Sequence, residues 1–344
     1  MEQLLPHLEI FSRVGQLLLA AILCLSGFIG LAGLINLLGK RPRWQVVSGQ
    51  GLIALTCLFA LGFLLIAWMH FRIFQTLPLE LPPELAGWLN SNLKAMNGRS
   101  PYGMPLYDPA APPRYYLPLW IEHEKYYFWF FCYTVMALVA HFRLAHPRLR
   151  AGLHLLLAGQ AVILYFGVNP FSEPLPRFFA EVGPWFAGPM PPMERLGLFM
   201  KLYPRQIFYY NAHYMWFHPP MLFLAYGCIT VVFVTSLLML AKRDPAVEQL
   251  GYSYAKFGYF MFTLGMLLGY PWALQAWGPN WWWDPKICSS IMMWAVFSTY
   301  LHTRLYANKP GMWYFSSGLG ILCFVAMVFT LLASFFFPGE HTMQ

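Results

Sequence analysis

Eight apolar runs, each close to the length that crosses a lipid bilayer, constrain the fold of this chain more than any other feature. They are residues 15–38, 49–69, 126–142, 151–171, 216–241, 257–274, 287–303 and 312–337, of which the third and seventh are short. A helix needs about 20 mainly apolar residues to cross the hydrocarbon core, where unpaired backbone groups are costly. The sequence therefore predicts an all-α, polytopic membrane bundle of about eight transmembrane helices.

The charged residues indicate the orientation of the bundle. Only 10% of residues are charged, against about 25% in soluble domains. The formal charge of +8 comes from Lys and Arg at the ends of apolar runs, a pattern that does not favour nucleic-acid binding. Four short connections are basic, through Lys40, Arg41 and Arg43, then Arg143, Arg148 and Arg150, then Lys242 and Arg243, then Arg304 and Lys309. The positive-inside bias places them in the cytoplasm and both termini outside.

Three other connections, residues 70–125, 172–215 and 275–286, then lie outside. The first two are too long to be simple connectors and are expected to form a lid or interfacial helices. No internal repeat or boundary divides the chain, so residues 1–344 are expected to form a single integral membrane domain.

The outer connection before the seventh run is rich in tryptophan. Between Trp277 and Asp284, four tryptophans and one aspartate occur in eight residues. Tryptophan is also enriched in the belts that anchor proteins at membrane interfaces. A belt does not require this ordered pattern, so the segment is interpreted as a rigid aromatic surface with one polar anchor.

These residues resemble a known signature. The run Trp277, Gly278, Trp281, Trp282, Trp283, Asp284 and Pro285, followed by Ser289, Ser290, Met292, Trp294 and His302, is similar to the WWD signature of heme-handling proteins in cytochrome c biogenesis, of the CcsA/ResC and CcmF/NrfE types. Residues 217–227 resemble the HPP segment of the CcmF type, and residues 117–124 resemble that type's segment before its third helix. The resemblance covers about residues 115–344, the predicted WWD-type core, and implies that the tryptophan segment forms an external platform for the heme edge.

The resemblance also implies two external histidine ligands for heme iron. His218 opens the fifth apolar run and His341 follows the eighth, so the predicted topology places both at the level of the tryptophan segment. Neutral imidazole is a common axial ligand of heme. His213 is the alternative to either.

A second histidine pair is implied inside the bundle, binding a b-type heme. His302 and His141 end the seventh and third runs at the cytoplasmic side, with His146 and His154 as alternatives to His141. The other interpretation is that each caps its helix, because a basic group at a helix C-terminus is favoured by the helix dipole.

Basic residues outside the membrane are candidates for pairing with the heme propionates. Arg72, Arg114 and Lys286 lie in or beside the outer loops. Charged side chains near phospholipid headgroups are common, so a lipid contact is an equal alternative for each.

Together these features predict a cytochrome c assembly protein, and a heme lyase (holocytochrome c synthase) component is one interpretation of its role. It would bind heme b and promote its covalent attachment to apocytochrome c, alongside other cytochrome c assembly membrane proteins. Its expected location is the cytoplasmic (inner) membrane of a bacterium or an equivalent organelle membrane. The chain has Ile287 where the family usually has Glu, which supports an alternative: a b-heme electron-transfer, quinone-linked or scaffold subunit without ligase activity.

Overall fold

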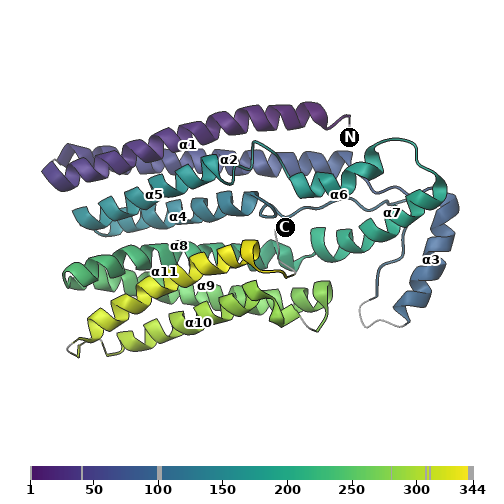
Figure 1. Ribbon diagram of the computed structural model, residues 1–344. Helices are drawn as coiled ribbons and strands as arrows, with labels where there is room; N and C mark the ends of the chain where they lie inside the picture. The colour runs from purple at the N-terminus through teal and green to yellow at the C-terminus, as the bar shows by residue number, and fades with distance from the viewer. Residues whose placement is uncertain are drawn as a thin grey trace.

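The chain is α-helical, as the apolar runs predict. A computed structural model describes residues 2–39, 42–98, 103–279, 281–306, 308–309 and 311–339, and no β-strand forms within these ranges. Eight long helices lie alongside one another (Figure 1), each containing most of one predicted run. They are α1 (Leu5–Gly39), α2 (Pro42–Thr76), α4 (Glu124–Arg143), α5 (Pro147–Phe166), α8 (Tyr214–Ala241), α9 (Pro245–Trp277), α10 (Pro285–Arg304) and α11 (Met312–Phe336). The predicted fold class is confirmed.

Six of these helices are long and apolar enough to cross a membrane, namely α1, α2, α5, α8, α9 and α11. The other two, α4 and α10, have 20 residues each and contain the two runs that are short in the sequence. Their aromatic and polar residues lower the mean hydropathy below that of an aliphatic helix. The described chain is thus an integral membrane protein, and the full count of eight crossings stays a prediction.

Several helix ends differ from the apolar runs because capping groups, and not hydropathy, decide where a helix ends. α9 begins at Pro245, well before residue 257, and Asp244 Oδ1 accepts hydrogen bonds from the backbone N–H groups of Ala246 (2.9 Å) and Val247 (3.3 Å). α5 ends at Phe166, before residue 171, with Gly167 as its C-cap. An apolar run thus indicates the part of a helix that lies in the membrane and does not give these two helix ends.

Three shorter helices occupy the two long connections, residues 70–125 and 172–215. α3 (Pro83–Asn97), α6 (Pro176–Phe186) and α7 (Pro192–Arg205) gather at one end of the bundle, at the right of Figure 1. α1 begins and α11 ends at this same end, which we call the helix-capped end, and α9 meets α10 there. The basic connections lie at the opposite end. The expectation that the long loops contain additional helices is therefore met.

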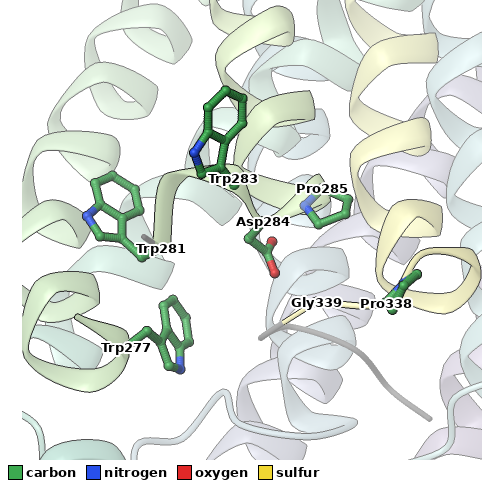
Figure 2. A pocket seen from close by; sticks show the side chains of 7 residues that line it. All are labelled: Trp277, Trp281, Trp283, Asp284, Pro285, Pro338 and Gly339. Carbon is green, nitrogen blue, oxygen red and sulfur yellow. The ribbon is translucent and has the colours of Figure 1, made fainter. Parts of the chain in front are cut away.

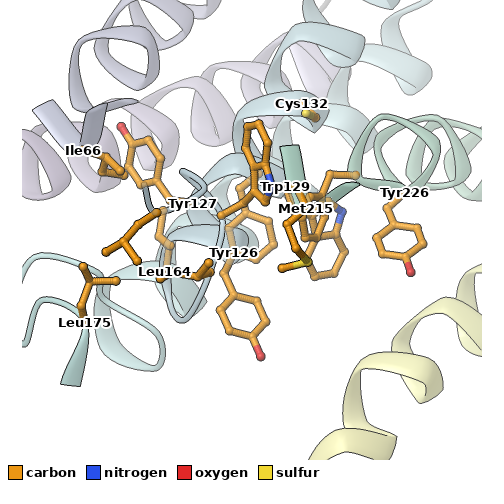
Figure 3. Packing of buried hydrophobic residues seen from close by; sticks show 14 of the residues in the cluster. Ile66, Tyr126, Tyr127, Trp129, Cys132, Leu164, Leu175, Met215 and Tyr226 are labelled. Carbon is orange, nitrogen blue, oxygen red and sulfur yellow. Dashed lines mark hydrogen bonds between the residues drawn. The ribbon is translucent and has the colours of Figure 1, made fainter. Parts of the chain in front are cut away.

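Helix α8 lies at the centre of the packing and contacts α4, α9 and α11. Figure 3 shows part of the buried core, with aromatic side chains of α4 beside Ile66 of α2 and Met215 of α8. Tyr127 is fully buried, and its hydroxyl donates a hydrogen bond to the carbonyl of Phe59 (3.0 Å). This core joins α4 firmly to α2 and α8, so the first residues of α4 and α8 are held together at the helix-capped end.

Candidate functional site

The tryptophan segment folds as a sharp connection between α9 and α10. α9 ends at Trp277, and Gly278 follows with φ +76°, a left-handed conformation that favours glycine. Trp281–Trp283 forms a single 3₁₀ turn, and Pro285 begins α10. Gly278 and the Asp-Pro pair therefore have a role in forming this connection, whether or not the segment binds a ligand.

The four indole rings differ in their surroundings. Trp277 packs edge-to-face on Trp272 of α9, with ring centroids 4.6 Å apart. Trp282 and Trp283 stack on each other at 4.0 Å and are 45% and 66% exposed. Exposed tryptophan rings of a membrane protein face either lipid headgroups or a bound ligand. Trp277 is therefore held in place against α9, whereas Trp282 and Trp283 present exposed rings.

A cavity of about 200 Å³ lies within this segment. Figure 2 shows its lining, which consists of Trp277, Trp281, Trp283, Asp284, Pro285, Pro338 and Gly339. The last two residues follow α11, so the C-terminal part of the chain closes one side. Ligand pockets usually measure about 300–1,000 Å³, so this cavity can receive the edge of a large planar ligand and leave the rest exposed.

Asp284 has a structural role that the sequence analysis did not identify. It is buried, and its Oδ1 accepts hydrogen bonds from the backbone N–H groups of Lys286 (3.0 Å) and Ile287 (3.3 Å). It is therefore the N-cap of α10, with Pro285 at the first helical position. Asp followed by Pro before an apolar run is a helix-start signal, and this signal was available in the sequence.

His218 lies in the first turns of α8 and faces α9. Its Nδ1–H donates a hydrogen bond to the carbonyl of Gly265 at 2.6 Å. At Gly269, an added Cβ would lie 2.6 Å from His218 Nδ1 and Cε1, so a larger residue would push the ring away. Nε2 makes no hydrogen bond to the described residues and keeps its lone pair. A metal-ligating histidine commonly has this arrangement, in which one nitrogen donates to a carbonyl and the other binds the metal.

An aromatic series joins His218 to the tryptophan segment. The imidazole stacks over Trp272 at 6.3 Å with an interplanar angle of 28°, and Trp272 in turn contacts Trp277. A flat aromatic ligand on Trp277 would therefore be close to the His218 side of the bundle. The donor, the stacking rings and the partly open cavity fit heme.

The remaining outer histidines are less well defined. His341 lies outside the described residues, although Gly339, two residues before it, lines the cavity. His213 is exposed and immediately precedes α8. Of the three outer candidates, His218 is thus the one that the structure connects to the tryptophan segment.

The two inner candidates, His302 and His141, have different surroundings. His302 is exposed, and its Nδ1–H donates to the carbonyl of Ser298 in its own helix (2.9 Å). His141 is buried and stacks on His154, with Nδ1 and Nε2 3.1 Å apart. The main neighbours of α10 are α9 and α11, whereas those of α4 are α2, α5 and α8. The structure therefore brings His141 to the alternative His154, while His146 accepts a hydrogen bond from Leu149 N (3.1 Å) as the cap of α5.

Glu122 is a further residue that the sequence analysis did not single out. Its Oε2 accepts a hydrogen bond from Arg177 N (3.1 Å) and its Oε1 accepts one from Phe178 N (2.8 Å), so it caps α6. Burial raises the pKa of Glu122, and the two backbone hydrogen bonds partly oppose this. The contact fixes α6 beside the start of α4. No sequence signal could have shown it, because donor and acceptor are 55 residues apart.

Comparison with known proteins identifies the family of this chain. A family model described as "Cytochrome C assembly protein" matches residues 120–339. The cytochrome c biogenesis protein CcsA of Cyanidium caldarium is 40% identical over 84 residues, which cover 23% of this chain and 28% of the relative. CcsA of Synechococcus sp. strain RCC307 is 34% identical over 103 residues, which cover 28% and 32%.

These matches span a third or less of the curated relatives. No solved structure matches. The family match covers more than half of the chain and includes His218, the tryptophan segment and the residues that close the cavity. This integral membrane protein, of a bacterial or organellar membrane, belongs to the cytochrome c assembly protein family.

Proposed function

We propose that this protein binds heme b at the helix-capped end of the bundle and promotes its covalent attachment to apocytochrome c. The observation that carries the proposal is the position of His218, whose Nδ1–H is bound to Gly265 and whose Nε2 keeps its lone pair beside the tryptophan segment. Heme supplies vinyl groups that react with the cysteine thiols of the apocytochrome. The contribution of this chain is to hold the macrocycle in position.

Each part of the site has a distinct task. His218 would ligate the iron, and the Gly265 carbonyl would fix the orientation of its ring. His341 is proposed as the second axial ligand, with His213 as the alternative. Trp277, Gly278, Trp281, Trp282, Trp283 and Asp284 would form the surface for one heme edge.

For the inner site, we propose that His302 and His141 each contribute to the binding of a b-type heme. The proposal does not require that both ligate the same iron. His302 Nδ1–H donates within its own helix and His141 lies beside His154, so each histidine is tested separately. His302→Ala and His141→Ala should each lower heme retention in the purified protein. Unchanged heme content in both variants would remove the inner site.

The test of function is cytochrome c formation in a bacterial host that lacks its own assembly factors and receives the relevant partner subunits. Wild-type protein should restore heme-stained cytochrome c and His218→Gly should abolish it, whereas His213→Gly should retain it if His341 is the second ligand. Restored cytochrome in the His218→Gly strain would contradict the ligand assignment.

A second candidate function follows from Ile287, which stands where related signatures usually have Glu. An electron-transfer or scaffold subunit would keep heme and the fold without ligase activity. In the same host, wild-type protein that carries heme but forms no cytochrome c would favour this second function.

A further inference from the structure

We propose that a groove between α4 and α9 binds one anionic phospholipid. The phosphate would pair with Arg143, and the first part of an acyl chain would lie on the apolar lining residues. The groove lies at the end of the bundle that carries the basic connections, which we call the basic end, whereas the tryptophan segment lies at the helix-capped end (Figure 1). The inference is therefore independent of the proposed heme site.

A cavity of about 210 Å³ forms the groove, between the last turns of α4 and the early turns of α9. Its lining residues come from one face of each helix: Met136, Val139 and Arg143 of α4, and Ser253, Tyr254 and Phe257 of α9. Both helices pack against α8, and the Tyr254 hydroxyl donates a hydrogen bond to the Met136 carbonyl (2.9 Å). The two walls are thus held in place by the packing of three helices.

The two walls change from polar to apolar at the same level of the bundle. The apolar run of α4, residues 126–142, ends directly before Arg143, and the apolar run of α9 begins at Phe257. α9 has 33 residues, or about 50 Å of helix, so its first turns extend beyond a hydrocarbon core of about 30 Å. The groove therefore lies where hydrocarbon meets the headgroup layer, which is the depth at which a phospholipid has its phosphate.

The apolar side of the groove faces lipid. Val139 and Phe257 are 43% and 41% exposed, and the neighbouring Phe142 and Phe260 are exposed as well. Exposed apolar side chains of a membrane bundle lie against acyl chains, which are as apolar as they are. A lipid can therefore enter the groove from the bilayer without crossing water.

Arg143 supplies the positive charge of the groove. It is exposed, and none of the ion pairs among the described residues includes it. Two other arginines of the basic end are engaged, because Arg150 donates to the His141 carbonyl (2.8 Å) and Arg304 pairs with Glu248 (2.6 Å). A guanidinium presents a fork of donors that matches two phosphate oxygens.

An anionic phospholipid fits this groove better than heme does. The lining contains no histidine to ligate iron, and its volume is below the range of about 300–1,000 Å³ that is usual for ligand pockets. Such a space receives part of a flexible chain and not a macrocycle. Basic pockets between transmembrane helices also bind anionic headgroups in other membrane proteins.

The test measures binding of the first lipid to purified full-length protein in detergent by native mass spectrometry. Wild-type protein should bind phosphatidylglycerol about tenfold more tightly than phosphatidylcholine with the same acyl chains, the size expected for a charge-assisted contact. Arg143→Gln should remove this preference and leave phosphatidylcholine binding unchanged. Arg148→Gln is the matched control, because it removes an equal charge from an exposed position at the basic end that does not line the groove. It should keep the preference.

The position of the lipid is tested with a phosphatidylglycerol that carries a photoreactive group near the start of one acyl chain, in phosphatidylcholine nanodiscs. Cross-links should lie in residues 136–143 or 253–257, and Arg143→Gln should reduce them. Thermal unfolding checks that both variants are folded, and the wild-type comparison of the two lipids needs no variant.

Three results would each overturn the site. The first is equal affinity of wild-type protein for the two lipids. The second is an equal loss of preference in Arg148→Gln and Arg143→Gln, which would indicate attraction to the whole basic surface. The third is displacement of phosphatidylglycerol by glycerol phosphate at the same concentration, which would identify a free phosphate ester as the ligand.

Discussion

At the scale of single residues, the position of His218 depends on two glycines of the neighbouring helix. Gly265 supplies the carbonyl that accepts from Nδ1, and Gly269 leaves space for the ring. The HPP segment identifies His218 in the sequence. The two glycines could not be predicted, because they are about 50 residues away and their role exists only when α8 packs against α9.

Gly269→Ala should lower heme affinity by about tenfold, because the new Cβ displaces the imidazole, and 1.4 kcal/mol of lost binding corresponds to that factor. Heme titration of the purified variant measures the effect. Gly159→Ala is the matched control, since a Cβ there meets nothing within 4 Å. Equal affinities in the two variants would mean that the ring does not need its observed position.

At the scale of elements, the tryptophan segment combines a helix start with a binding surface. The sequence indicated the aromatic surface, yet the carboxylate interpreted as a ligand anchor is the N-cap of α10. The same pattern of residues serves both purposes, because Asp-Pro ends a turn and starts a helix. A ligand role and a capping role for Asp284 can be separated by substitution.

Asp284→Ala should lower the free energy of unfolding by about 1 kcal/mol, the usual cost of losing an N-cap. Asp284→Asn should cost much less, because the amide oxygen still accepts from Lys286 N and Ile287 N. Thermal unfolding in detergent gives both values. If Asn destabilises the protein as much as Ala, the cap is not the main role of this residue.

At the scale of the whole molecule, hydropathy predicted the bundle well because burial in lipid requires apolar helices whatever their neighbours are. The contact of His141 with His154 could not be predicted in the same way. Topology gives the depth of a residue along the bundle and not its position around it. His141 and His302 were assigned one depth, and the structure shows them on helices with different neighbours.

The orientation of the bundle is tested by cysteine labelling. In a background without the six native cysteines, Met190→Cys should react with an impermeant maleimide in intact cells, and Arg243→Cys should react only after the inner membrane is opened. A permeant maleimide should label both. Labelling of position 243 from outside would reverse the orientation and place the tryptophan segment in the cytoplasm.

The central claim is that this chain holds heme through His218, and a pyridine hemochrome spectrum of the purified protein tests it most directly. The account predicts a b-type spectrum for wild-type protein. It predicts less heme per protein for His218→Gly, with partial recovery when imidazole is present during expression, because imidazole can occupy the vacated space and bind iron. A heme-free wild-type protein, or a His218→Gly variant with undiminished heme, would contradict the account.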